Sequence, residues 1–186
     1  MTQKILVIRF SSIGDIVLTT PVIRTLHKQL GAEVHFLTKL AFAPILLSNP
    51  HVAKVIALSD EFDDLLSALR GEQYDHIIDL HHNIRTKRIK IALARPSTAF
   101  QKLNFQKWLL VRFGINRLPD THIVDRYLAA GVSLGIKRDE KGLDIYIPSG
   151  KEIDIRTTFG TDPGTYVAIV IGAAHLTKCL TMDQIT

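Results

Sequence analysis

Residues 4–30 read KILVIRFSSIGDIVLTTPVIRTLHKQL, and this stretch decides the fold. Its first part, Ile5 to Phe10, is a short apolar run with the length and composition of a buried strand. The run ends at the polar segment 11–15, after which apolar residues recur at helical spacing from Ile16 to Leu30. The pattern predicts a strand, a tight loop and a helix. Ligands bind outside the carboxyl ends of strands in open α/β sheets, so residues 11–15 are the first candidates for a functional site.

The same alternation continues along the chain. Further strands are expected at 33–38, 52–58, 75–80, 97–100 and 143–147, and helices at 41–47, 60–70, 84–93, 105–113 and 123–134. Repeated strand–helix units are typical of a parallel sheet with helices on both faces. The sequence therefore predicts an α/β, Rossmann-like fold.

The composition of the sequence changes after Pro148. Glycines and prolines punctuate residues 149–165, which we interpret as a linker with a small helix at 151–158. One more strand is expected at 166–171. We therefore expect a first domain at 1–148, a linker at 149–165 and the start of a second domain at 166–186. A strand without a sheet cannot bury both faces, so either it joins the first sheet or the second domain is truncated.

Composition excludes several classes of protein. With 186 residues and 46% apolar content, the chain is large enough for one ordinary domain with a core. The sequence contains no run of about 20 apolar residues, so no transmembrane helix is predicted. The single cysteine, Cys179, excludes an internal disulfide framework and a cysteine-rich zinc cluster, and fits a reducing cytoplasm.

Positive charge is concentrated in one window. Between Asp79 and Asp120 there is no acidic residue, while nine of the 23 Lys and Arg residues lie there: Arg85, Lys87, Arg88, Lys90, Arg95, Lys102, Lys107, Arg112 and Arg117. A segment of this kind indicates an anionic partner, such as a phosphorylated sugar, a membrane surface or a nucleic acid, although a solvated basic face is the simpler alternative.

Four motifs resemble the signatures of one enzyme family. They read RFSSIGDIVLTTP at 9–21, DLHHNIRT at 79–86, HIVDRY at 122–127 and GAAHLTK at 172–178. They are similar to motifs of the heptosyltransferases, glycosyltransferase family nine. The resemblance implies the amino-terminal, acceptor-binding domain of a GT-B enzyme, followed by the first loop of the donor domain. It further implies a cytoplasmic, inverting transfer of heptose from ADP-heptose to an anionic, lipid-linked acceptor of the lipopolysaccharide inner core, without a metal cofactor.

The resemblance also assigns roles to individual residues. Asp15 matches the catalytic base, which takes the proton of the acceptor hydroxyl. The residues implied in donor-phosphate binding are Lys178, Thr177, Ser12 and Gly14. Those implied in acceptor binding are Ser11, Asn83, Arg85 and Arg126. Each role has a structural alternative: Ser12 and Asp15 have the spacing of a capping box, Asn83 suits a helix N-cap, and Lys178 and Arg126 suit a protein surface.

The chain departs from the family pattern near its end. Lys178 is followed by Cys179 and Leu180 instead of an arginine, and the family's later Asp-Thr-Gly-x-x-His motif does not occur. We therefore expect these 186 residues to be inactive by themselves. The adjacent His81 and His82 are not expected to share a metal ion, because neighbouring side chains on a strand point to opposite faces.

Two other functions compete with this interpretation. A non-catalytic Rossmann-like module that binds phosphate or a nucleotide is one, although the chain has neither a G-x-G-x-x-G fingerprint nor a P-loop. Nucleic-acid binding through the basic window is the other, but no recognition module is present, so no nucleic-acid partner is expected.

Aromatic residues within the basic window leave one further question open. Phe105, Trp108, Leu109 and Phe113 share one stripe of the helix expected at 105–113. The stripe either docks at the inner leaflet of the plasma membrane, as a peripheral contact, or packs on the sheet as core.

Overall fold

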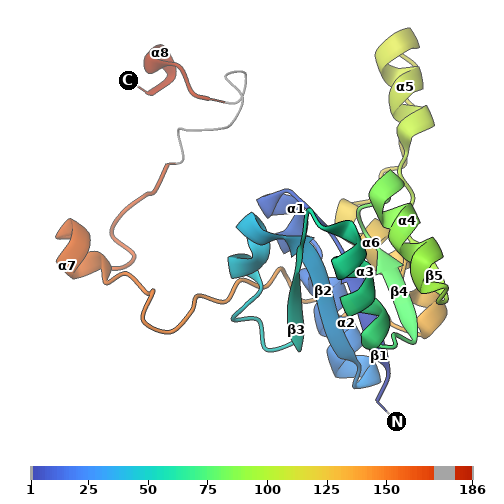
Figure 1. Ribbon diagram of the computed structural model, residues 1–186. Helices are drawn as coiled ribbons and strands as arrows, with labels where there is room; N and C mark the ends of the chain where they lie inside the picture. Colours follow the sequence, from blue (N-terminus) through green and yellow to red (C-terminus); the bar gives the residue numbers. More distant parts are fainter. Residues whose placement is uncertain (1, 170–178, 186) are drawn as a thin grey trace. The chain divides into compact units, whose positions relative to one another are not determined.

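The first 148 residues are built around a five-stranded parallel sheet. The computed structural model describes residues 2–169 and 179–185, and the chain divides into two compact units, Met1–Pro148 and Ser149–Thr186. The sheet of the first unit contains β1 (Lys4–Ile8), β2 (Glu33–Lys39), β3 (Lys54–Leu58), β4 (His76–Asp79) and β5 (Ser97–Ala99). All neighbours pair in parallel, in the order β3-β2-β1-β4-β5 (Figure 1). The predicted α/β fold with a parallel sheet is confirmed.

Helices cover both faces of this sheet. One face is covered by α1 (Ile13–Val17), α2 (Thr20–Leu30) and α6 (Ile123–Ala129), together with the 3-10 segment η1 (Leu40–Ile45). The other face is covered by α3 (Phe62–Gly71) and α4 (Ile84–Leu93). The unit therefore has three layers, in the doubly wound arrangement of nucleotide-binding folds.

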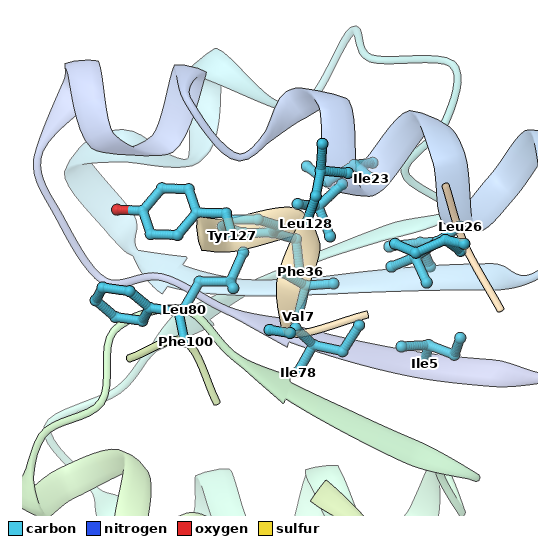
Figure 2. Packing of buried hydrophobic residues seen from close by; sticks show 14 of the residues in the cluster. Ile5, Val7, Ile23, Leu26, Phe36, Ile78, Leu80, Phe100, Tyr127 and Leu128 are labelled. Atoms are coloured by element: carbon cyan, nitrogen blue, oxygen red, sulfur yellow. The ribbon is translucent and has the colours of Figure 1, made fainter. Parts of the chain in front are cut away.

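Strand β1 lies at the centre of both cores. Ile5 and Val7 face the α1, α2 and α6 layer, whereas Leu6 and Ile8 face α3 and α4, and all four are fully buried. Since successive side chains alternate faces, a strand covered on both sides has to be apolar at every position. Figure 2 shows the first of these cores, where residues of the sheet meet residues of α2 and α6: Ile5, Val7, Phe36, Ile78, Ile23, Leu26, Tyr127 and Leu128.

The strand order places a crevice at one point of the sheet. From β1 the chain adds β2 and β3 on one side, and then returns to add β4 and β5 on the other. Ligands of doubly wound sheets bind at this reversal, outside the carboxyl ends of the two central strands. Here these ends are the segments that follow Ile8 of β1 and Asp79 of β4.

The helix predicted from Ile16 to Leu30 is interrupted, so this part of the prediction is wrong. Two helices, α1 and α2, meet at Leu18 and Thr19. The Thr19 hydroxyl donates to the carbonyl of Ile16 over 2.6 Å. Pro21 stands in the first turn of α2, where a backbone N–H would have no partner within the helix, so proline is tolerated there. The break makes α1 a single short turn that carries the loop 11–15.

Two other helices are shorter or tighter than predicted. Residues 41–47 contribute to the 3-10 segment η1 instead of an α-helix, and Pro44 inside it cannot donate an α-helical bond. The helix expected at 123–134 ends at Ala129, and a 3-10 turn, η2 (Val132–Leu134), follows. At Gly131 an added Cβ would lie 2.3 Å from Cδ1 of Ile136, so a larger residue there would require the Ile136 side chain to shift.

No strand forms at 143–147, where the alternating pattern predicts one. Leu143, Ile145 and Ile147 are exposed. The segment is held by polar contacts instead: the backbone N–H of Asp144 donates to the Thr20 hydroxyl over 2.9 Å, and the Asp144 carboxylate pairs with Arg24. Alternation alone does not make a strand, because the backbone needs a neighbouring strand with which to pair.

The remaining helices bury little. The helix α5 (Asn104–Phe113) has no buried residue. In the second unit, α7 (Ile155–Phe159) falls at the small helix predicted for 151–158, and α8 is Met182–Ile185. Residues Tyr166–Ile169 are exposed and form no strand, contrary to the prediction for 166–171. The rest of that predicted strand lies outside the described residues.

Candidate functional site at the carboxyl ends of β1 and β4

A cavity of about 330 Å³ lies at the crevice that the strand order creates. Its walls come from the segments after β1, β4 and β5 and from the first turns of α5 and α6. The lining residues are Arg9, Asp15, His81, Phe100, Lys102, Asn104, Lys107, Ile123, Arg126 and Tyr127. Four of them are Lys or Arg, so the cavity is suited to an anionic ligand. One, Asp15, is a carboxylate that can accept a proton.

Arg9 is the central residue of this cavity, and the sequence analysis did not single it out. It follows β1 directly and is almost buried. Its Nε donates to the carbonyl of Ser11 (2.7 Å), its Nη1 donates to the carbonyl of Leu80 (2.6 Å), and its Nη2 pairs with Oδ2 of Asp15 (2.6 Å). The guanidinium also lies over the ring of Tyr127, 5.8 Å from the centroid. One side chain therefore links the loop after β1, the end of β4 and α6.

Asp15 stands in the first turn of α1, with its carboxylate at the cavity. The backbone N–H and the hydroxyl of Ser12 both donate to Oδ2 of Asp15, each over 3.1 Å. The spacing of Ser12 and Asp15 predicts this kind of contact, in which the first turn of a helix is closed by its own side chains. Burial raises the pKa of Asp15, but the hydrogen bond from Ser12 and the charge of Arg9 outweigh it and leave the pKa below its usual value. Asp15 is therefore ionised at neutral pH.

His81 lines the cavity from the end of β4. Its ring packs on Phe10, with 4.8 Å between centroids, and its backbone N–H donates to the Asp79 carboxylate over 3.1 Å. Asp79 is fully buried and pairs with Nζ of Lys90 over 3.0 Å, so this loop is tied to the sheet and to α4. Burial, with Arg9 and Lys102 nearby, lowers the pKa of His81 to about 4. His81 is therefore neutral at neutral pH.

The structure places the predicted acceptor-binding residues at different points. Arg126 lies in the wall of the cavity, over the ring of Phe100. Asn83 caps α4, where its side chain accepts from the backbone N–H of Thr86 over 2.9 Å, and it lines another cavity instead, with His82, Ile84, Lys87 and Lys90. Arg85 is exposed and does not line the cavity of Asp15. Their roles toward an acceptor stay predictions.

The predicted donor-binding residues are placed only in part. Ser12 and Gly14 are exposed beside Asp15, and an added Cβ on Gly14 would meet no atom within 4 Å, so the surface next to α1 is open. Ser11, predicted to bind the acceptor, precedes them and is half-buried. Thr177 and Lys178 lie outside the described residues.

The lining residues to which the four motifs assigned no role share one property. Arg9, Lys102, Lys107 and Tyr127 come from segments far apart in the chain and meet only in the folded unit. A signal did exist for Arg9, because a charged residue at the end of a fully apolar strand has to find a partner when it is buried. Within the ranges 2–169 and 179–185, no group of three His, Cys, Asp or Glu side chains is arranged to hold a metal ion.

Comparison with known proteins agrees with the motifs. No protein-family profile matches the chain. The curated lipopolysaccharide heptosyltransferase 1 of Campylobacter coli is 26% identical over 107 residues, which cover 54% of this chain and 31% of that protein. The glycosyl transferase family 9 structure from Veillonella parvula superposes with a TM-score of 0.63 at 22% identity, over 78% of this chain and 45% of the other. E. coli heptosyltransferase WaaC, solved with ADP, gives a TM-score of 0.57 at 19% identity, over 76% and 51%.

The two solved structures establish the fold, and the curated relative adds a sequence match. The chain spans about half the length of these structures and about a third of the length of the curated relative. Over that part, the resemblance to the heptosyltransferases of glycosyltransferase family nine, predicted from the four motifs, is confirmed.

Proposed function

We propose that this chain is the acceptor-binding part of an inverting glycosyltransferase that moves heptose from ADP-heptose to an inner-core lipopolysaccharide acceptor. One observation carries the proposal: an ionised Asp15 lies in a cationic cavity at the crevice between β1 and β4, in the motif that resembles the family's catalytic segment. Two of the relatives named above are heptosyltransferases, and one of these two was solved with ADP.

The chemistry needs a base at this point. As the acceptor hydroxyl oxygen forms a bond to the anomeric carbon, the bond from that carbon to the diphosphate breaks and ADP leaves with the electron pair. The hydroxyl proton passes to the Asp15 carboxylate, and inversion follows from attack on the face opposite the leaving group. Because Asp15 is ionised at neutral pH, it is available to accept this proton without a prior deprotonation.

The cations of the cavity suit an acceptor that carries carboxylate or phosphate groups. Lys102, Lys107 and Arg126 lie in its wall with Asp15, and arginine binds such groups in a bidentate manner. We assign the donor phosphates to Ser12 and Gly14, beside α1, and to Thr177 and Lys178. In this assignment a lysine, instead of a metal ion, balances the negative charge of the leaving diphosphate. Turnover that survives a chelator supports it, and turnover that the chelator abolishes contradicts it.

The test of the function is Asp15→Asn. Asparagine can still accept hydrogen bonds at α1 but cannot take the proton, so transfer should fall by about 10²–10⁴-fold while the fold is kept. Turnover of ADP-heptose is measured in the longest form of the chain that its gene encodes, for parent and variant. Asp64→Asn, an exposed change on α3, is the matched control and should be neutral.

The outcomes separate the two functions. If Asp15→Asn turns over like the parent, the assignment of the base is wrong. If neither protein transfers heptose but both bind ADP or phosphate saturably, the non-catalytic nucleotide-binding module is the better description.

A membrane contact of α5 is the second part of the proposal. The aromatic residues of α5 form an exposed cluster, in which Phe105 stacks on Trp108 (6.0 Å between centroids) and Trp108 meets the edge of Phe113 (5.3 Å). No residue of α5 is buried, so the structure does not support the alternative in which the stripe is core. Lys107 and Arg112 accompany the cluster on the same helix. No helix in the described part of the chain is long and apolar enough to cross a bilayer.

Exposed aromatic residues beside cations fit the surface of an anionic bilayer, where each basic residue contributes about 1 kcal/mol. We expect co-sedimentation with anionic vesicles but not with zwitterionic ones, weakened by salt and by Trp108→Ser. Phe159→Ser in α7 removes another exposed aromatic residue and serves as the control. A parent protein that ignores anionic vesicles, or a Trp108→Ser protein that unfolds, would contradict the contact.

A further inference from the structure

The donors around Asp15 all reach the same oxygen. Nη2 of Arg9, the backbone N–H of Ser12 and the hydroxyl of Ser12 contact Oδ2, at 2.6, 3.1 and 3.1 Å. Within the described ranges, no group donates a hydrogen bond to Oδ1. The two oxygens of this carboxylate therefore differ: one is held by the protein, and the other is free to bind a further donor.

The principal donor is itself fixed. The Arg9 side chain is only 10% exposed, and two carbonyls, of Ser11 and Leu80, hold its Nε and Nη1. The guanidinium is a rigid planar fork, so these two bonds determine where Nη2 lies. Ser11 belongs to the loop after β1 and Leu80 follows β4. The position of Oδ2 is thus set by the two central strands of the sheet and not by α1 alone.

We propose that Arg9 is a positioning residue, which pins Oδ2 of Asp15 and leaves Oδ1 as the oxygen that receives the acceptor's proton. The inference rests on the proposed function. In the transfer step the hydroxyl O–H bond breaks as the bond to the anomeric carbon forms, the proton goes to Oδ1, and the nucleoside diphosphate leaves with its electron pair. Ser11, Leu80 and Asp15 already engage the three nitrogens of the Arg9 guanidinium, so Arg9 acts on the reaction through the carboxylate.

A lysine cannot take the place of Arg9 in this arrangement. It has the same charge, but its single ammonium group lacks the planar fork that joins two carbonyls to a carboxylate. Arg9→Lys therefore keeps the electrostatic attraction to Asp15 but holds the Asp15 carboxylate less firmly in one orientation. Because a misplacement of about 1 Å can cost about 10²-fold in rate, kcat should fall by about 10- to 100-fold with little change in KM. If Arg9 has only a structural role, every Arg9→Lys protein that folds should have the same kcat as the parent.

The contact itself is tested on the 186-residue chain by NMR. The carboxyl ¹³C signal of Asp15, assigned with Asp15→Asn, should titrate below the usual range in the parent and return toward about 3.9 in Arg9→Gln. Arg95→Gln, which removes a charge at the other end of the sheet next to β5, is the control and should leave the titration unchanged. An unchanged Asp15 titration in folded Arg9→Gln overturns the proposal.

Two further readouts keep the test decisive. If Arg9→Gln does not fold, the guanidinium ¹⁵N signals of Arg9 in the parent should follow the titration of Asp15, and this response should vanish in Asp15→Asn; its absence from the parent overturns the proposal. In turnover assays, an Asp15→Asn protein that transfers heptose like the parent rejects Asp15 as the base, and with it the positioning role of Arg9. An inactive Asp15→Asn beside a fully active Arg9→Lys rejects only the positioning role.

Discussion

Two segments of this chain are rich in β-branched residues and have opposite environments. The run Lys4–Ile8 forms β1, and its four apolar residues are fully buried. The run Tyr166–Ile169 contains an aromatic residue and two β-branched residues, yet Val167 is 88% exposed and Ile169 is 71% exposed. By composition alone both are strands.

The difference lies in what surrounds each segment. β1 pairs with β2 on one side and with β4 on the other, and helices cover both of its faces. Residues 166–169 pair with no strand among the described residues. Strand propensity expresses how well a side chain fits a half-buried pleated surface, so it has no effect where no such surface is available. The same reasoning explains the exposed segment 143–147.

The largest expected effect comes from one substitution made in both segments. Ile8→Ala removes fully buried atoms between the sheet and α3, and should lower the free energy of unfolding of the first unit by about 4 kcal/mol. Ile169→Ala should change it by less than about 0.5 kcal/mol, since that side chain is exposed. Urea denaturation measures both. Equal losses would mean that residues 166–169 are packed in solution, and would break the comparison.

A second pair of substitutions extends the comparison to charges. Arg24 is nearly buried and binds Asp139 (2.7 Å) and Asp144, whereas Arg156 pairs with Asp162 at an exposed site of the second unit. Arg24→Met should cost about 3 kcal/mol, because two partly buried carboxylates lose their partner. Arg156→Met should cost less than about 1 kcal/mol. Thermal unfolding distinguishes them, and a neutral Arg24→Met would show that this ion pair does not hold segment 139–144 in place.

The smallest expected effect depends on pH. Glu72 contacts Lys54 and Lys4, whose hydrogen bonds lower its pKa to about 2. A carboxylate whose pKa is lower in the folded state stabilises the fold above its unfolded pKa, and this contribution is lost as pH falls toward the folded pKa. Glu72→Gln should therefore destabilise the first unit by up to about 1 kcal/mol at pH 7, and by almost nothing near pH 2.

The control for this pH dependence is Glu152→Gln, an exposed change in the second unit. It should leave the stability of the first unit unchanged at either pH. If the effect of Glu72→Gln is the same at pH 7 and near pH 2, the ionised carboxylate is not the source of the stabilisation.

Local patterns were sufficient for much of the fold. The apolar run at β1, the helix at Ile84–Leu93 with its Asn83 cap, and the contact between Ser12 and Asp15 are all found where the sequence predicts them. Each depends on residues within a few positions of one another, so periodicity and capping rules suffice. The location of Asp15 at a strand end follows from the same local pattern.

Other parts of the fold depended on partners far along the chain. Arg9 reaches Leu80, 71 residues away, and the cavity adds Lys102, Lys107 and Tyr127 from segments that no local rule joins to Asp15. The same is true of the exposed runs at 143–147 and 166–169, where propensity predicted strands that found no neighbour.

The residues that are suited to a strand, a helix turn or a general base can be read from the chain, because those properties are local. Which strands pair, which charges meet and which oxygen of Asp15 is held depend on contacts between distant segments. Burial stabilises such contacts only when all partners are in place, and for that reason they were visible only in the folded unit.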